Sequence, residues 1–322
     1  MSKYKQDILL FLLEHKNEYL SGQKLADHFN ISRTAIWKAI EGLKEQGFQF
    51  DSVKNKGYRI ISLPNHWDRD LLTYMLKDSI FDRLFVYQQV SSTQTMAHEL
   101  RLKYEEPLLI LSEIQTEGRG RFKRQWLSQP HTGLWMSLVL HPNISFRQIA
   151  TFNLFISIAI AETIKKVCHI NPKIKWPNDI YIDDKKVCGF LTEINGNSDG
   201  VDTIICGIGI NINHEKNDFD SELSKTATSL MLECGSKIDR YIFLKSLIES
   251  VELYYRMFLD KPFSDIKDIY KDYSMIWDRT LRYTEGKKQI FGRAVDLKDD
   301  GVLVVLDESG QLHQFISADI EV

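Results

Sequence analysis

Residues 175–211 read KWPNDIYIDDKKVCGFLTEINGNSDGVDTIICGIGIN, and this stretch decides how the centre of the chain folds. Two apolar runs, VCGFLTEI and ICGIGINI, have the length and β-branched content of buried strands. The Asp-Asp-Lys sequence at 183–185 predicts a hairpin turn before the first of them. From Leu84 onward, such strands alternate with longer helical stretches. The sequence therefore predicts a mixed α/β domain over 81–274.

Polar and small residues interrupt these strands at positions typical of a binding site. KWPND, from Lys175 to Asp179, makes a poor core and a good binding edge at a strand end. Lys186 enters an apolar strand, where its cation would stabilise a carboxylate attacking an α-phosphate, but alone it also fits a surface lysine beside a turn. In GIGIN (207–211) the glycines leave room for a flat ring and Asn211 offers an amide, although a close-packed buried strand explains them as well.

A basic, glycine-containing loop precedes this stretch, with the sequence QTEGRGRFKRQW over Gln115–Trp126. Gly118 and Gly120 permit positive φ and close approach, so that their amide protons can face an anion. The cations of the loop are Arg119, Arg121, Lys123 and Arg124. Such a loop suits a nucleotide phosphate together with a substrate carboxylate, whereas a solvated basic loop is the alternative. It is not a Walker A loop, because no GK[ST] follows.

The first 63 residues have the order of elements of a winged helix-turn-helix. Three helical patterns, over 5–13, 21–29 and 32–46, precede two strand patterns around a Lys-Asn-Lys-Gly turn. Such a unit places its last helix in the major groove of DNA and its wing near phosphates. The residues predicted to contact DNA are Ser32, Arg33, Thr34, Trp37, Lys38, Lys54 and Lys56. A packing module without a nucleic-acid role is the alternative.

Charge and composition bound the other possibilities. The first 63 residues hold ten lysines and arginines against seven acidic residues, whereas the whole chain carries a net charge of −3. This weak positive charge predicts weak DNA binding by one copy, so we expect a dimer on an inverted repeat. The longest apolar run, 152–160, is about half the length of a membrane-spanning helix. Because the start of the chain also lacks a signal-peptide pattern, we expect a cytoplasmic protein without a membrane partner.

Cysteine and histidine usage predicts no metal site in the protein. The four cysteines lie in apolar sequence without the spacing of a zinc site, so we expect buried, reduced thiols. The nine histidines show no metal-ligand spacing either.

The remaining segments predict supporting structure. Residues 64–80 are expected to form a linker that leads into a short helix, and 239–273 contain helical patterns that we assign to the core. Residues 275–322 contain two hairpin patterns, through Glu-Gly and Glu-Ser-Gly, which predict a small SH3-like barrel. No catalytic constellation is visible there, so a structural or carrier-docking role is expected.

The ordered set SST (91–93), GRGR (118–121), KWPND, KVCGFLTE and GIGIN resembles the biotin–protein ligases. Within them, the chain is similar to the bifunctional class that also acts as the biotin operon repressor. The resemblance covers essentially the whole chain, and only Gln94 departs from the motifs, since many relatives have Asn there. It implies a central ligase domain like that of class II aminoacyl-tRNA synthetases, between the winged helix and an SH3-like barrel.

The resemblance implies a role for each motif. Biotin would be bound by Ser92, Thr93, Gln94, Gln115, Arg119, Gly120, Arg121, Lys186 and Gly189. The nucleotide would be bound by Arg121, Arg124, Trp126, Lys175, Asn178, Asp179 and Asn211. The catalytic residues would be Lys186, Arg119 and Arg121.

The implied reaction joins biotin to ATP as biotinyl-5'-AMP, with Mg²⁺ screening the phosphates. Biotin would then pass to a lysine of the carrier domains of acetyl-CoA carboxylase or pyruvate carboxylase. The adenylate is expected to order the GRGR loop and to promote a homodimer, with Phe122 at its interface, that binds operator DNA and represses genes for biotin synthesis and transport. Two alternatives remain: a ligase for lipoate or another acid, and a regulator that only binds a small effector.

Overall fold

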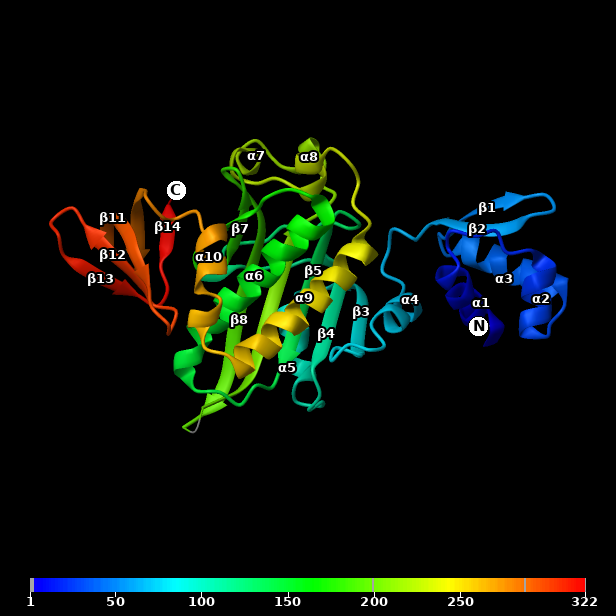
Figure 1. Ribbon diagram of the computed structural model, residues 1–322, viewed down its shortest axis with the longest axis horizontal. Coiled ribbons are helices and arrows are strands. Elements are labelled where there is room, and N and C mark those ends of the chain that lie inside the picture. The colour runs from blue at the N-terminus through cyan, green and yellow to red at the C-terminus, as the bar shows by residue number, and fades with distance from the viewer. Residues whose placement is uncertain (1–2, 199, 287, 322) are drawn as a thin grey trace. The chain divides into compact units, whose positions relative to one another are not determined.

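The N-terminal unit is a helical domain with a two-stranded wing. The computed structural model describes residues 3–198, 200–286 and 288–321, and the chain divides into two units, Met1–Lys77 and Asp78–Val322. The elements of the first unit are α1 (Lys3–Glu14), α2 (Gly22–Phe29), α3 (Arg33–Glu45), β1 (Gln49–Val53), β2 (Gly57–Ser62) and α4 (Arg69–Met75) (Figure 1). This order confirms the winged helix-turn-helix pattern predicted from the sequence.

Local chemistry explains the helix-turn-helix. The hydroxyls of Ser21 and Ser32 accept hydrogen bonds from the backbone amides of Lys24 and Ala35, so both serines act as the N-caps predicted for α2 and α3. Asn30 ends α2 in the left-handed conformation, with φ of 52°. The chain can therefore turn sharply into α3, whose Ile36 and Ile40 are buried.

The wing is tied to the helices by a close backbone approach. Leu20 pairs with Tyr58 through backbone hydrogen bonds of 2.9 Å in both directions. At the neighbouring Gly57, φ is 113° and a Cβ would lie 2.0 Å from the carbonyl oxygen of Leu20. Only glycine fits there. After the wing, α4 packs in the same unit, where the Tyr74 hydroxyl donates to Glu14 Oε1 over 2.7 Å.

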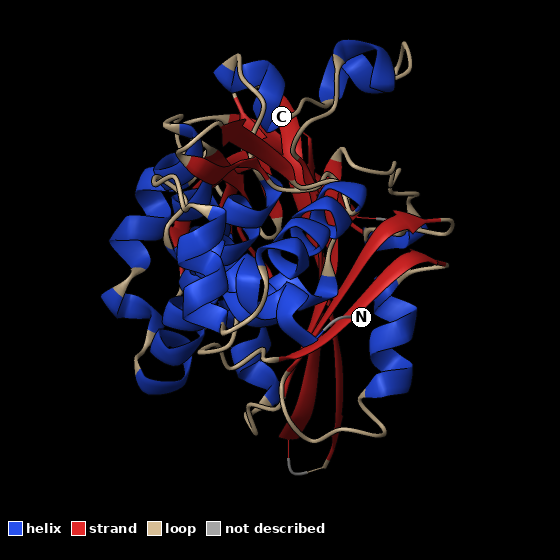
Figure 2. Ribbon diagram, turned by 90° about the vertical axis from the view of Figure 1, so that its right-hand side faces the viewer, coloured by secondary structure: helices blue, strands red, loops and turns tan. Residues whose placement is uncertain are grey.

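The second unit is built on a mixed seven-stranded sheet of order β3-β4-β5-β9-β8-β7-β6. Its strands are β3 (Arg83–Val90), β4 (Leu108–Gln115), β5 (Gly133–Leu140), β6 (Lys173–Lys175), β7 (Asp179–Ile182), β8 (Lys185–Asn197) and β9 (Gly200–Asn211). Strands β3 and β4 are parallel, and every other neighbouring pair is antiparallel. The predicted turn at Asp183 joins β7 to β8, and the long β8–β9 hairpin extends beyond the helices (Figures 1 and 2).

Helices cover this sheet and share its core with the strands. They are α5 (Thr93–Leu100), α6 (Ile149–Cys168), α7 (Leu223–Thr226), α8 (Leu230–Cys234), α9 (Arg240–Asp260) and α10 (Lys267–Tyr273), with short 3-10 turns at 121–123, 146–148, 216–218 and 263–265. Helices α6 and α9 lie side by side across one face of the sheet (Figure 1). Phe152 and Phe155 of α6 pack against Phe258 of α9. In the described part of the chain, no helix is long and apolar enough to cross a membrane.

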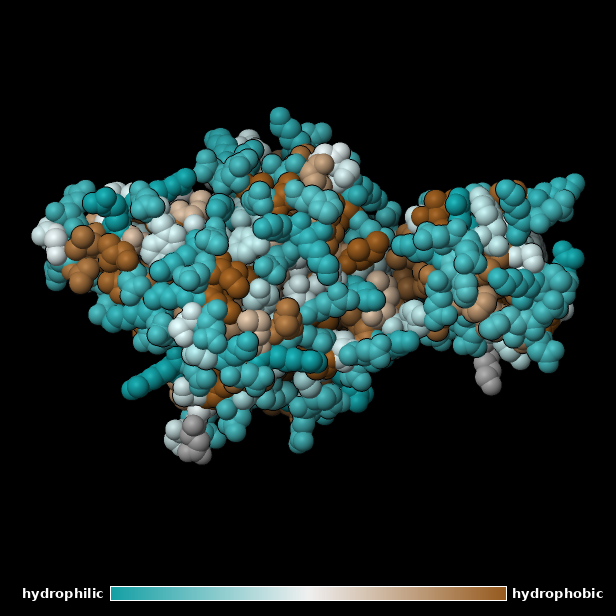
Figure 3. All heavy atoms as spheres, in the orientation of Figure 1, coloured by the Kyte–Doolittle hydropathy of each residue, from teal (hydrophilic) through white to brown (hydrophobic). Residues whose placement is uncertain are grey.

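The tail of this unit forms a five-stranded sheet of order β13-β12-β11-β10-β14. Its strands are β10 (Thr280–Glu285), β11 (Lys288–Leu297), β12 (Leu303–Asp307), β13 (Leu312–Phe315) and β14 (Asp319–Glu321). Both predicted hairpins are present as β10–β11 and β12–β13. Hydrophilic residues cover most of the face seen in Figure 3, but a brown area lies over β12 and β13, where Leu312 is exposed.

The cysteines follow the prediction only in part. All four are free thiols, and Cys168, Cys188 and Cys206 are buried as expected. Cys234, the last residue of α8, is half-buried, so the prediction of four buried thiols is wrong there.

Candidate active site

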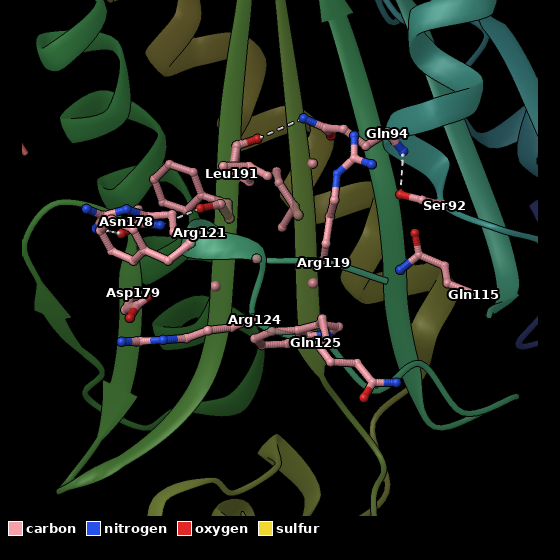
Figure 4. Close-up of a pocket in the computed structure, with 18 of the residues that line it drawn as sticks. Ser92, Gln94, Gln115, Arg119, Arg121, Arg124, Gln125, Asn178, Asp179 and Leu191 are labelled. Carbon is pink, nitrogen blue, oxygen red and sulfur yellow. Dashed lines mark hydrogen bonds between the residues drawn. The ribbon is translucent and has the colours of Figure 1, made fainter. Parts of the chain in front are cut away.

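One pocket lies over the middle of the central sheet. Its walls come from the start of α5, the end of β4, the loop 116–126 and strands β7, β8 and β9. Of the residues predicted to bind biotin or nucleotide, all except Lys175 and Asn211 line it. Figure 4 shows Ser92, Gln94 and Gln115 on one side, Asn178 and Asp179 on the other, and Arg119 between the two sides.

A buried hydrogen-bond network forms one end of the pocket. Gln115 Oε1 accepts from the backbone amide and the hydroxyl of Thr93, over 2.8 and 3.1 Å. The hydroxyl of Ser137, on β5, lies 2.8 Å from Thr93 Oγ1 and 3.1 Å from Gln94 Oε1. The Gln94 amide group donates to the carbonyl of Leu191 over 3.3 Å (Figure 4). These polar groups are fixed by one another, so this end is preorganised.

Gly207 makes the space in which the Gln94 amide lies. A Cβ at this position would lie 2.2 Å from Gln94 Oε1. Ser92 adds to the same arrangement as the N-cap of α5, because its hydroxyl accepts from the Gln94 backbone amide over 3.2 Å. Gly207 of the GIGIN segment therefore leaves room for the side chain of Gln94, which follows the SST motif.

The GRGR loop folds back as a small hairpin above the sheet. The amide of Trp126 donates to the carbonyl of Gly118, and the amide of Gly120 donates to the carbonyl of Arg124, each over 2.8 Å. The Gly120 amide is therefore used inside the loop, and the prediction that it faces an anion is wrong in this structure. Gly120 is extended, with φ of −106°, whereas Phe122 is left-handed, with φ of 55°. The close approach predicted for Gly118 is present, since a Cβ there would lie 2.5 Å from the Trp126 carbonyl oxygen.

The three arginines of the loop have different partners. Arg119 lies 3.6 Å from Glu193, whose other carboxylate oxygen is 2.7 Å from His98 Nε2. Arg121 donates to Asn178 Oδ1 over 3.0 Å and to Ser317 Oγ over 2.7 Å. The partners of Arg124 are Asp319, with which it forms an ion pair, and the ring of Phe122.

Lys186 lies between a carboxylate and an aromatic ring. Its Nζ is 2.8 Å from Asp179 Oδ1 and 5.4 Å from the centre of the Trp126 ring. The indole of Trp126 lies against Gly209, where a Cβ would come within 2.6 Å of it. The flat ring for which the GIGIN glycines leave room is, in this structure, the chain's own Trp126. Its buried Nε1 has no hydrogen-bond partner among the described residues.

Two predicted nucleotide-binding residues lie outside the pocket. Lys175 is half-buried beside β7, where its Nζ lies 3.1 Å from the hydroxyl of Tyr181. Burial lowers the pKa of this lysine, although Asp179 opposes the shift. Asn211 donates to the carbonyl of Thr228 over 3.0 Å and faces a neighbouring cavity, which also contacts Trp126 and Lys186.

The neighbouring cavity contains a buried histidine that sequence reasoning did not select. His214 Nε2 lies 3.1 Å from Thr132 Oγ1, and its ring stacks on Phe219. Burial lowers the pKa of His214 to about 4, so the ring is neutral at physiological pH.

The KWPND segment differs from the prediction at Trp176. This residue is only 2% exposed and belongs to the core, which contradicts the expectation that the segment packs poorly.

Sequence reasoning also missed Ser137, Glu193 and Asp319. Ser137 carries a weak signal, as a hydroxyl within the apolar run GLWMSLVL. Glu193 is the last residue of KVCGFLTE, a motif in which only Lys186 and Gly189 are predicted to bind a ligand. Asp319 lies in the tail, for which no part in the site was expected, and no local pattern distinguishes it.

The residues predicted to contact DNA divide into two groups. Arg33, Thr34, Trp37 and Lys54 line one groove between α3 and the wing. Ser32, Lys38 and Lys56 are not part of that lining, and the Ser32 hydroxyl is used as the cap of α3. Trp37 has 53% of its surface exposed beside this groove, so its ring is accessible to a ligand there.

The described residues contain no group of three or more histidine, cysteine or acidic side chains that could hold a metal ion.

Comparisons with known proteins agree with this geometry. Residues 86–211 match the biotin/lipoate A/B protein ligase family, 5–59 match an HTH domain, and 280–322 match the biotin protein ligase C terminal domain. The biotin protein ligase from Aquifex aeolicus in complex with biotin and ATP superposes with a TM-score of 0.65 at 29% identity, covering 75% of this chain and 98% of that chain. The fold and the site thus define a protein ligase of the biotin/lipoate class, with an N-terminal HTH domain and a C-terminal β-rich domain.

Full-length relatives narrow the family further. The bifunctional ligase/repressor BirA of Bacillus subtilis is 37% identical over 322 residues, which is 99% of each chain. The bifunctional ligase/repressor BirA of Escherichia coli is 25% identical, covering 97% of this chain and 95% of that protein. The chain belongs to the family of the bifunctional ligase/repressor BirA.

Proposed function

We propose that this protein activates biotin with ATP as biotinyl-5'-AMP and transfers the biotinyl group to a lysine of a carrier protein. One observation carries the proposal: a single pocket combines the buried amide and hydroxyl network around Gln94 with the cations Arg119, Arg121 and Lys186. A ureido ring needs donors and acceptors together, and a carboxylate that meets a phosphate needs positive charge. Biotin carries both groups.

The side chains divide the work of the reaction. Ser92, Thr93, Gln94, Gln115 and Gly189 would bind the biotin head. The biotin carboxylate attacks the α-phosphorus of ATP and pyrophosphate leaves, while Lys186, Arg119 and Arg121 offset the charge that builds up between the two anions. The lysine amine of the carrier then attacks the carbonyl carbon of the adenylate, and AMP leaves.

The nucleotide would lie between the loop and the neighbouring cavity. We assign the adenine side to Trp126 and Asn211, because both border that cavity. We assign the phosphate side to Arg124, Asn178 and Asp179, with Lys175 as a more distant charge. Mg²⁺ bound with ATP would offset the negative charge of the phosphates.

The finer description of the fold belongs to the same proposal. We propose domain limits of 1–63, 64–80, 81–274 and 275–322 for the winged helix, linker, ligase domain and tail. The sheet with α6 and α9 on one face supports a ligase domain of the class II aminoacyl-tRNA synthetase type, and the antiparallel tail supports an SH3-like barrel.

The helix-turn-helix supports a second activity of the same chain. We propose that the adenylate-bound protein is a homodimer that binds an inverted repeat and represses genes for biotin synthesis and transport. The carriers would be the biotin domains of acetyl-CoA carboxylase or pyruvate carboxylase. Phe122 is the proposed interface residue, because this aromatic residue is 61% exposed on the loop that lines the pocket.

Biotin-dependent ATP–pyrophosphate exchange tests the ligase reaction. We expect exchange with biotin but not with lipoate, reduced about 100- to 1000-fold in Lys186→Ala, because charge stabilisation at the reacting phosphate is lost. Lys185→Ala is the matched control, since this exposed lysine is adjacent on the same strand. Biotin binding without exchange would instead favour a regulator that senses biotin as an effector.

Sedimentation analysis tests the switch. We expect biotinyl-5'-AMP to shift wild-type protein toward dimer, and Phe122→Ala to weaken that shift. Leu102→Ala is the control, because Leu102 is comparably exposed away from the loop. Equal dimerisation with and without the ligand would contradict the proposal, because a ligand with no differential affinity shifts no equilibrium.

A further inference from the structure

The tail of the chain enters the candidate active site through residues 317–319. Arg121 Nη2 donates to Ser317 Oγ over 2.7 Å and to the carbonyl of Ala318 over 3.2 Å. The next residue, Asp319, accepts from Arg124 and lines the pocket. Two arginines of one loop are therefore held by three consecutive residues of the tail.

The tail treats these two arginines differently. The hydrogen bonds of Arg121 to Asn178, Ser317 and Ala318 use neutral acceptors, which orient the guanidinium. The carboxylates of Asp179 and Asp319 also attract its charge, although its hydrogen bonds are to these neutral groups. Arg124 instead forms an ion pair with the carboxylate of Asp319, which offsets its charge. Arg121 is therefore oriented by hydrogen bonds to neutral groups, whereas Arg124 is in direct contact with a carboxylate.

The Arg124 pair is also the more easily broken. The Arg124 side chain is 68% exposed and that of Asp319 is 29% exposed. An ion pair this open to solvent contributes little stability. Carboxylate and phosphate oxygens make the same kind of charge-assisted hydrogen bond to a guanidinium, and a triphosphate offers several such oxygens. Arg124 can therefore exchange Asp319 for phosphate at small cost.

We propose that Asp319 is a positioning residue that holds Arg124 at the edge of the pocket and competes with the triphosphate of ATP for it. This inference rests on the proposed function in one respect, since it requires ATP to bind in this pocket. The competition weakens ATP binding, and in return it keeps the exposed arginine near its working position.

Calorimetric titration with ATP tests the competition directly. Asp319→Asn keeps the size of the side chain and removes its charge, so the Kd for ATP should fall about twofold to fivefold, the range set by an exposed ion pair. Asp296→Asn is the matched control, because Asp296 pairs with Lys267 over 3.1 Å in the same tail but does not line the pocket. Its Kd for ATP should equal that of the wild type.

Three results would overturn the inference. An unchanged Kd for ATP in Asp319→Asn would mean that the Arg124–Asp319 pair does not affect ATP binding. A higher Kd would mean that Asp319 helps to bind ATP. In an Arg124→Gln background, Asp319→Asn should change the Kd much less. The same fold-change there would mean general charge repulsion rather than competition for Arg124. Pyrophosphate exchange by the wild type, measured in parallel, tests the ligase function separately, because the titration needs no turnover.

Discussion

The two ends of the candidate pocket are built in opposite ways. At the Gln94 end, Thr93, Gln94 and Ser137 are buried and hydrogen-bonded to one another. At the loop end, Arg119 and Arg124 are exposed, and their partners are carboxylates that solvent also reaches. Buried polar groups must keep their partners, whereas exposed charges can exchange them. The Gln94 end is therefore suited to recognising a ligand group of fixed shape. The loop end is suited to binding charged groups that change during the reaction.

The largest expected effect compares one glycine from each end. Gly207→Ala would place a Cβ 2.2 Å from Gln94 Oε1, whereas the nearest atom to a Cβ at Gly120 is 3.8 Å away. We expect Gly207→Ala to weaken biotin binding about 100-fold, since overpacking displaces a buried amide, and Gly120→Ala to change it less than about threefold. Calorimetric titration with biotin checks both variants. Similar losses in the two would remove the distinction between a rigid and an adaptable end.

The second test measures how strongly the burial of one polar group, His214, makes the stability of the fold depend on pH. The folded protein holds His214 neutral with a pKa of about 4, so below the ordinary pKa of histidine the unfolded state binds a proton that the folded state does not. Stability should therefore fall as pH falls from 7 toward 4, with about 2 kcal/mol lost to this group by pH 5. Denaturant unfolding at pH 7 and 5 measures it. His214→Gln should remove that part of the pH dependence, and an unchanged slope would exclude His214 as its source.

The third test removes one member of the network. Ser137→Ala leaves Thr93 and Gln94 without a shared partner, and we expect a KM for biotin about tenfold higher with little change in the KM for ATP. Ser112→Ala is the control, because this equally buried hydroxyl donates to the carbonyl of Ile114 and Ser112 does not line the pocket. If Ser112→Ala raised the KM for biotin as much, the effect would reflect general destabilisation.

The smallest expected effect is a difference in salt dependence between the two ends of the pocket. Raising the ionic strength from about 0.05 to 0.5 M shortens the Debye length and screens the exposed arginines. We expect the KM for ATP to rise severalfold and the KM for biotin to change by less than about twofold. Steady-state exchange at both ionic strengths measures the two constants together. A larger shift for biotin than for ATP would contradict the division of the pocket proposed here.

Local sequence patterns were sufficient to predict the main helices, turns and hairpins named here. Ser21, Asn30 and Ser32 define the helix-turn-helix, because capping and left-handed turns depend on neighbouring backbone atoms. The Asp183 turn and the two hairpins of the tail are local in the same sense. The motifs of the pocket were visible as polar interruptions of apolar strands, and all but Lys175 and Asn211 come together in one pocket.

What the sequence alone determined, then, is the list of elements and the residues with chemistry to offer. Only the tertiary structure decided which of them meet. It paired Gln94 with Ser137, let Trp126 cover Gly209, and brought Asp319 to Arg124 across 195 positions of sequence. The physical reason is that caps and turns are set by nearby backbone atoms, whereas these contacts depend on how the central sheet and the tail pack. No periodicity in a strand or loop records such a contact.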